Sequence, residues 1–269
     1  CIRDRINSNL DMNITKYVCV DWKALVDVID ALGGLDLDLT KEEVHWVNGY
    51  ITETANSIGY PCDALKGEGR VHLNGVQAVS YSRIRYTSGD DFLRASRQRI
   101  VLQAILEKCK GEDIATLTSM CSSMMDDIST NFTVKEILAL AKNVTKYQIS
   151  STTGFPYNVA TKELSGVGDT VIPIDLATDV VQLHKYLFED ESYTVSDTVQ
   201  SISDTVQKKT DVDSKTDIYD TTKYNNTAGS TGTEGAKKKN KDAQDALKKS
   251  QSESENDSTT KSSSDDSDD

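Results

Sequence analysis

The sequence predicts an α/β fold, namely a layered α/β/α domain in which helices flank a central mixed sheet. Segments with the two-residue alternation of strands are separated by segments with helical spacing, and residues that cap helices stand at the helical starts. The composition then changes at Lys208, after which the chain is almost wholly charged residues, Ser, Thr, Asn and Gly. We therefore expect a domain over residues 1–207 and a disordered acidic and polar tail over 208–269, because the tail has too little apolar surface to offset the entropy of ordering.

The first clear helix follows Asp21, a residue type favoured at helix N-caps. Its apolar set at helical spacing is Trp22, Leu25, Val26, Ile29 and Leu32. Gly33-Gly34 ends it, since glycine adopts the left-handed conformation at little cost. The segment LDLDL at 35–39 alternates apolar and acidic residues, which is typical of a half-exposed strand.

Local signals also predict the later elements. Thr40 with Glu43 has the pattern of a capping box, which predicts a helix to about residue 58. Further helices are expected at 76–85 after Asn74-Gly75, at 91–111 starting with Asp91, and at 113–125, 134–146 and 175–190. Further strands are expected at 147–155 and 170–175.

The charge balance argues against nucleic acid as a partner. The chain has 30 Lys and Arg against 43 Asp and Glu, a net charge of −13, whereas DNA binding usually needs a net basic face. No apolar run approaches the ~20 residues of a membrane span, and nothing resembles a signal peptide. The chain begins without methionine and reads like the middle of a domain, so we expect a fragment that lacks N-terminal sequence.

The five cysteines do not indicate a zinc site, because none has CxxC spacing and the three histidines are scattered. Buried or idle thiols and a disulfide both fit this pattern. In an oxidising compartment the expected pairing is Cys109 with Cys121 or Cys62.

The candidate site is RIRYTSGDDFLRASRQR at 83–99, which holds five arginines and two aspartates. On a helix Asp91, Arg94 and Gln98 share one face. An apolar stripe further along the same helix would suit an anionic headgroup joined to a lipid; its members are Val101, Leu102, Ile105 and Leu106.

Arg83 and Arg85 reach this helix from the end of the preceding one. Guanidinium groups make bidentate contacts with phosphate oxygens, and an aspartate among them can orient a guanidinium or meet Mg²⁺. The pattern therefore indicates a site for a pyrophosphate. A solvated helix face with Asp–Arg pairs carries about equal weight.

In addition, the sequence resembles the LytR-CpsA-Psr family of cell-envelope proteins. The matching segments are VIDALGGLDLDL (28–39), LNGVQAVSYSRIRY (73–86), GDDFLRASRQR (89–99), GFPY (154–157) and VIPIDLATDVVQLHKYLF (171–188). They occur in family order with family-like spacing, and such a series is more specific than any one short motif.

This resemblance implies transfer of an anionic glycopolymer, such as teichoic acid or capsule, from a polyprenyl pyrophosphate onto peptidoglycan by Mg²⁺-assisted phosphoryl transfer. It implies a location on the extracytoplasmic face of the membrane, in the cell envelope of a Gram-positive-type bacterium, with anchoring through an N-terminal helix that is missing here. The alternative is a non-catalytic regulator, or attenuator, that binds polyprenyl phosphate.

The resemblance also implies roles for individual residues. The family's Arg-x-Arg falls on Arg83 and Arg85, and its Asp-x-x-Arg-x-x-x-Gln falls on Asp91, Arg94 and Gln98. Asp91 and Arg94 are the expected catalytic residues, and Asp91 is the expected Mg²⁺ ligand. The expected pyrophosphate-binding set is Arg83, Arg85, Arg94, Arg97 and Gln98.

One part of the family pattern has no counterpart. The family's domain opens with a strand region that carries an aspartate near the metal and further arginines, and nothing before Cys1 supplies them. We therefore expect about two-thirds of the catalytic domain, about half of its active site, and little or no turnover by this chain alone.

Overall fold

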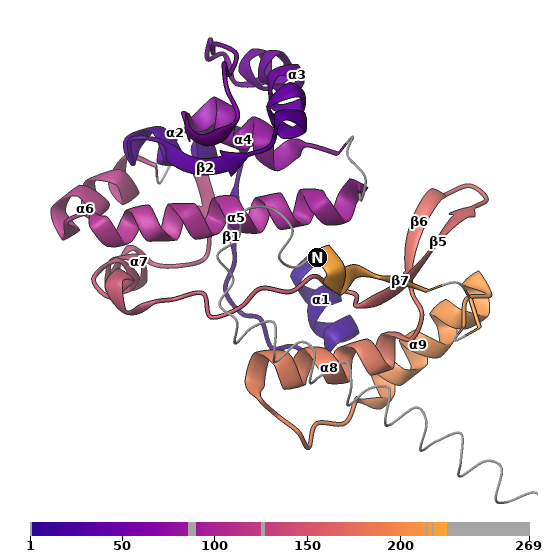
Figure 1. The fold of residues 1–269 in the computed structure, drawn as a ribbon. Helices are drawn as coiled ribbons and strands as arrows, with labels where there is room; N and C mark the ends of the chain where they lie inside the picture. Colours follow the sequence, from indigo (N-terminus) through magenta and orange to yellow (C-terminus); the bar gives the residue numbers. More distant parts are fainter. Residues whose placement is uncertain (1, 86–89, 125–126, 214, 217, 225–269) are drawn as a thin grey trace, which may run out of the picture. The chain divides into compact units, whose positions relative to one another are not determined.

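The computed structural model (Figure 1) describes residues 2–85, 90–124, 127–213, 215–216 and 218–224. At residues 90, 91, 223 and 224 it describes the backbone but not the side chain. The helices are α1 (Ile2–Leu10), α2 (Trp22–Ala31), α3 (Lys41–Ile58), α4 (Gly75–Arg83), α5 (Asp90–Gly111), α6 (Ile114–Ser123), α7 (Val134–Ala141), α8 (Leu176–Phe188) and α9 (Asp197–Thr210), with short 3-10 turns η2 (Val144–Lys146) and η3 (Thr221–Tyr224). The strands are β1 (Val18–Val20), β2 (Leu35–Leu39), β3 (Gly69–Leu73), β4 (Ile128–Thr130), β5 (Asn158–Leu164), β6 (Gly168–Pro173) and β7 (Tyr219–Asp220). The α/β class is thus confirmed.

The helices predicted at Asp21 and at the Thr40–Glu43 capping box are present with those caps, whereas the helix predicted from Asp91 begins at Asp90. The Asp21 carboxylate accepts the backbone N–H of Ala24 at 2.7 Å and begins α2. The capping box of Thr40 and Glu43 begins α3, which ends at Ile58 as expected. These bonds satisfy N–H groups that the first turn of a helix leaves without an intrahelical partner.

The sheets differ from the predicted central mixed sheet. Within the described residues the strands form three separate antiparallel sheets, in the orders β1-β4, β2-β3 and β6-β5-β7. Along β2 the residues alternate between buried and more exposed, so only one face lies on the core. Such one-sided strands suit antiparallel pairs, whereas parallel sheets need apolar residues on both faces.

One further expectation was wrong. Residues 147–155 form no strand, since their run of Ser and Thr offers local hydrogen bonds that compete with a sheet; β5 begins later, at Asn158. Residue 208, where the tail is expected to begin, lies inside α9, and β7 and η3 follow it. In this segment Val212 is buried against Ala160 and Ile172. Residues 225–269 of the predicted tail lie outside the described residues.

The largest core lies among α2, β2, β3, α3, α4 and α5 (Figure 1) and positions both arginine segments. Tyr81 of α4 and Val101 of α5 are almost fully buried in it. Gly75 allows α4 to approach α2, because a Cβ at this position would lie 2.4 Å from the Val26 carbonyl oxygen. No helix in the described part of the chain is long and apolar enough to cross a membrane.

Candidate active site

Arg83, the last residue of α4, is a cation held in place by α2 and α3. Its Nη1 donates to Thr54 Oγ1 at 2.8 Å, and its Nη2 donates to Glu53 Oε1 at 2.5 Å. The guanidinium carbon lies 5.4 Å from the ring centre of Trp22 and 5.6 Å from that of Tyr50, within cation–π range. Its side chain keeps 17% of its surface exposed, so the charge is fixed but reachable from solvent.

The other predicted residues follow along the chain. Arg85 is exposed just beyond the end of α4. On α5, Arg94 is half-buried and Gln98 is exposed. Asp91 lies in the first turn of α5, and its side chain is outside the described residues. Since α4 and α5 pack on each other, the fold brings the two arginine segments to neighbouring elements.

Arg97 is placed differently from the rest of the predicted set. Its side chain is only 4% exposed, and its Nε donates to Glu43 Oε1 at 3.1 Å. Its Nη1 donates to the Ile84 carbonyl at 3.4 Å, and its guanidinium carbon lies 5.9 Å from the ring centre of Tyr81. Burial, together with the Glu43 charge, raises the pKa of Tyr81. In this structure the Arg97 guanidinium therefore faces the protein interior.

Sequence reasoning missed Glu43 as a member of this cluster. Its capping role was clear, but its partner Arg97 lies 54 residues away in the chain. The burial of Arg97 could have been predicted from the helical spacing. Arg97 precedes the buried Val101 by four residues and therefore shares a helix face with it.

A second buried polar group lies on α8. Asp179 accepts hydrogen bonds from the backbone N–H groups of Tyr157 and Asn158, and within the described residues its Oδ2 has no hydrogen-bond partner. Burial raises the pKa of this carboxyl to about 8, and the nearby Asp175 adds to the rise. Asp179 lies within the family-like segment 171–188, but no role was predicted for it from the sequence.

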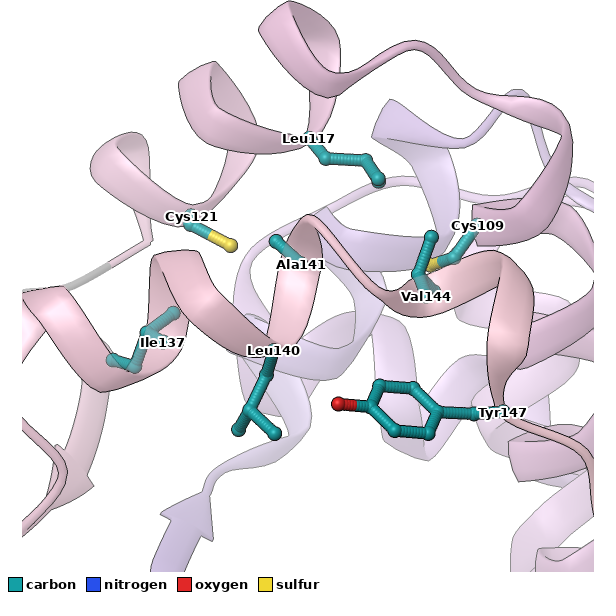
Figure 2. A pocket seen from close by; sticks show the side chains of 8 residues that line it. All are labelled: Cys109, Leu117, Cys121, Ile137, Leu140, Ala141, Val144 and Tyr147. Carbon is teal, nitrogen blue, oxygen red and sulfur yellow. The ribbon is translucent and has the colours of Figure 1, made fainter.

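An apolar cavity of about 540 Å³ lies at the C-terminal end of α5 (Figure 2). Its lining comes from α5, α6, α7, η2 and the residue that follows η2, and consists of Cys109, Leu117, Cys121, Ile137, Leu140, Ala141, Val144 and Tyr147. The expected apolar stripe is elsewhere, since Val101 is buried in the core and Leu102 is 57% exposed.

The cysteines do not form the expected disulfide. Cys109, Cys121 and Cys62 are free thiols. Burial raises the pKa of all three thiols, which keeps them protonated and poorly reactive.

The described residues hold no group of three or more His, Cys, Asp or Glu side chains that could bind a metal ion. Mg²⁺ needs fewer protein ligands than that, because it often takes one or two carboxylates together with substrate phosphates and water. Asp90 and Asp91 are two adjacent residues in the first turn of α5, and their carboxylates are of the type that binds Mg²⁺.

Curated relatives match about half of this chain. Bacillus subtilis TagV, a polyisoprenyl-teichoic acid–peptidoglycan teichoic acid transferase, is 27% identical over 139 residues, which are 51% of this chain and 33% of TagV. Bacillus mycoides TagU, described in the same words, is 30% identical over 138 residues, which are 50% of this chain and 40% of TagU. The chain thus spans between a third and two-fifths of the length of these relatives.

Solved structures share the fold. Protein gbs0355 from Streptococcus agalactiae has a TM-score of 0.53 and 26% identity, covering 71% of this chain and 63% of that one. A protein described as a transcriptional regulator from Enterococcus faecalis has a TM-score of 0.55 over 79% of this chain and 73% of its own, and at 16% identity it shows the fold alone. A sequence model of the LytR_cpsA_psr family matches residues 1–180, which include both arginine segments, and the chain therefore belongs to the LytR-CpsA-Psr family.

Proposed function

We propose that this protein acts in the transfer of an anionic glycopolymer, such as teichoic acid or capsule, from a polyprenyl pyrophosphate onto peptidoglycan. The observation that carries the proposal is the family match over residues 1–180, in a family whose relatives TagU and TagV are named as teichoic acid transferases. In this reaction a sugar hydroxyl of the acceptor attacks phosphorus, the bond to the prenyl phosphate breaks, and the polymer stays attached through a phosphodiester.

The arginines supply the positive charge that this reaction needs. Attack on phosphorus builds negative charge on the equatorial oxygens and on the leaving phosphate, and preorganised cations stabilise that charge more than they stabilise the bound substrate. The proposed cations are Arg83, Arg85 and Arg94, with Gln98 as a supporting polar group. Arg83 supports this role best, because its bonds to Thr54 and Glu53 hold the guanidinium in place while using only part of its five N–H donors.

Asp91 is the proposed acceptor of the hydroxyl proton or the ligand of Mg²⁺. When bound, Mg²⁺ would neutralise charge on the pyrophosphate oxygens. Asp91 and Arg94 lie within the first two turns of α5, so one helix start carries both proposed catalytic residues.

The apolar cavity of Figure 2 is the proposed place for the prenyl chain. It lies at the far end of α5 from the arginines: Arg94 and Cys109 are separated by about 22 Å along the helix axis. A lipid whose headgroup binds at the start of α5 would therefore lie along this helix.

The proposed setting follows from the same family. Transfer to peptidoglycan requires the extracytoplasmic face of the membrane, in the cell envelope of a Gram-positive-type bacterium, and an anchored lipid substrate requires the active site close to the membrane. The transferase names of TagU and TagV favour an enzyme over a lipid-binding regulator.

The test measures headgroup binding. Farnesyl pyrophosphate is titrated into the full chain by calorimetry, with and without Mg²⁺. Arg85→Ala is expected to weaken binding by ~10–100-fold, because a hydrogen bond to a charged group contributes ~1.5–3 kcal/mol and 1.4 kcal/mol is a factor of ten in affinity. The matched control is Arg70→Ala, which removes an arginine exposed on β3 beside Asp38.

Two further readouts separate the parts of the proposal. Affinity that rises from farnesyl to octaprenyl pyrophosphate, whose longer chain can span the ~22 Å from Arg94 to the cavity, and that Ala141→Trp reduces by filling the cavity, supports the chain site. Equal binding by the wild type and Arg85→Ala would contradict the headgroup site. In a transfer assay with lipid-linked teichoic acid, turnover would establish a transferase rather than a regulator that only retains the lipid, and it would also contradict the expectation of little or no turnover by this chain alone.

A further inference from the structure

The buried pair Glu43–Arg97 joins three helices beside the arginine segments. Glu43 Oε1 accepts from Arg97 Nε at 3.1 Å. Its second oxygen, Oε2, accepts from the backbone N–H of Thr40 at 3.0 Å and from the Thr40 hydroxyl at 3.2 Å. Each carboxylate oxygen thus has its own donor, so Glu43 ties Arg97 to the N-terminus of α3.

Arg97 also reaches the point where α4 ends. Its Nη1 donates to the carbonyl of Ile84, the residue that caps α4 and stands between Arg83 and Arg85. The last carbonyls of a helix have no intrahelical donor, and here a guanidinium from α5 supplies one. The bond of 3.4 Å is long, but the Ile84 side chain is fully buried in the core, so the backbone leading into Arg85 is held from two sides.

Arg94 lies one turn before this pair. It precedes Arg97 by three residues on α5, so both lie on one face of that helix. Through Arg97, the N-terminus of α3, the end of α4 and the N-terminal half of α5 therefore meet at one hydrogen-bonded point. The Glu43–Arg97 contact thus lies between the segment that carries Arg85 and the helix turn that carries Arg94.

A gain in folding stability does not explain why a charged pair is buried here. Removing two charges from water costs free energy that their attraction only partly offsets, and apolar side chains of similar volume often serve a core as well. What arginine adds is a planar fork that donates to two acceptors at once, which a lysine ammonium cannot do with the same geometry. The pair therefore serves to fix the relative positions of the segments that it joins.

We infer that Glu43 and Arg97 are positioning residues that hold Arg85, at the end of α4, at a fixed separation from Arg94, at the start of α5. This inference rests on the proposed function for its ligand, a prenyl pyrophosphate. A pyrophosphate has two phosphoryl groups and meets both arginines only at the correct separation, whereas a monophosphate needs only one of them. The pair thus determines the preference for pyrophosphate over monophosphate.

The first arm of the test needs no ligand. Amide hydrogen exchange is followed in the full chain for the wild type, for Arg97→Lys, and for Glu43→Gln/Arg97→Gln, which removes both charges in case the lysine variant does not fold. Exchange at residues 83–85 is expected to rise at least about tenfold in the variants, while exchange in the β5–β6 pair stays unchanged. The matched control is Arg70→Lys, at an exposed pair with Asp38. Unchanged exchange at 83–85 in a folded variant would overturn the inference.

The second arm measures selectivity. The ratio of affinities for farnesyl pyrophosphate and farnesyl monophosphate is expected to fall about tenfold in Arg97→Lys and to stay constant in Arg70→Lys. A folded Arg97→Lys protein that keeps the wild-type ratio shows a purely structural pair and would also overturn the inference. A wild type that binds neither probe refutes the proposed function instead, and the exchange at residues 83–85 then still decides whether the pair holds Arg85.

Discussion

Replacing the buried Asp179 by Asn should make the stability of the domain less dependent on pH. Burial raises the pKa of this carboxyl to about 8 in the folded chain, against an ordinary value of 3.8. Between these two values the folded state keeps a proton that the unfolded chain has released. The contribution of Asp179 to the free energy of unfolding therefore falls as the pH rises from about 4 to about 8, and this contribution is constant outside that window.

The size of the effect follows from the two pKa values. Each unit of difference corresponds to ~1.4 kcal/mol, so a difference of about four units amounts to at most ~6 kcal/mol. Domains have ~5–15 kcal/mol of stability in total, which makes this a large share. The amide of Asn keeps an oxygen for the N–H groups of Tyr157 and Asn158 but has no proton to lose.

The assay is urea unfolding followed by tryptophan fluorescence at several pH values between 4 and 9. The wild type should lose stability across this range, and Asp179→Asn should lose several kcal/mol less. Asp169→Asn, on the exposed side of β6, is the matched control and should follow the wild type. Parallel curves for the wild type and Asp179→Asn would refute the reasoning that burial keeps this carboxyl protonated.

Two substitutions test how the core holds the arginine segments and where the fold ends. Gly75→Ala should lower the free energy of unfolding by ~1–3 kcal/mol, because the new Cβ meets the Val26 backbone. Gly67→Ala is the control and should leave the stability unchanged, because a Cβ at residue 67 would have no atom within 4 Å. Equal melting temperatures for the two variants would contradict the close approach of α2 and α4. Val212→Ala should cost ~1–2 kcal/mol in urea unfolding because Val212 is buried against β5 and β6, and an unchanged midpoint would contradict this packing.

The sequence predicted α2 to α8 because their signals are local, but it missed α1 and α9. Asp21 and the Thr40–Glu43 box act on N–H groups within three residues, so reading the sequence reveals both the donor and the acceptor. Sheet pairing gives no such local signal: β2 pairs with β3 across the whole of α3, and β1 pairs with β4 more than 100 residues away. The prediction therefore reached the α/β class but not the three small antiparallel sheets.

For the candidate site, too, the sequence predicts the local features but not the contacts between distant residues. Its arginine-rich segments follow from the sequence, and helical spacing indicates which residues of α5 share a face. The partners of those residues do not follow from it, because Thr54 and Glu53 reach Arg83 from α3, and Glu43 reaches Arg97 across 54 residues. Whether an arginine faces solvent or the core depends on these distant contacts.

One face of α5 shows why the two arginines of this helix differ. Arg94, Arg97, Val101 and Ile105 follow one another at intervals of three or four residues, so they lie on the same side. Arg94 is half-buried, Arg97 is buried with Glu43, and Val101 is in the apolar core. This face of α5 thus becomes less polar from Arg94 towards Val101. The Glu43–Arg97 pair is the last polar group before the apolar core. A phosphate headgroup that binds Arg94 would therefore find the buried ion pair as the inner limit of its site, since the next turn offers only hydrocarbon.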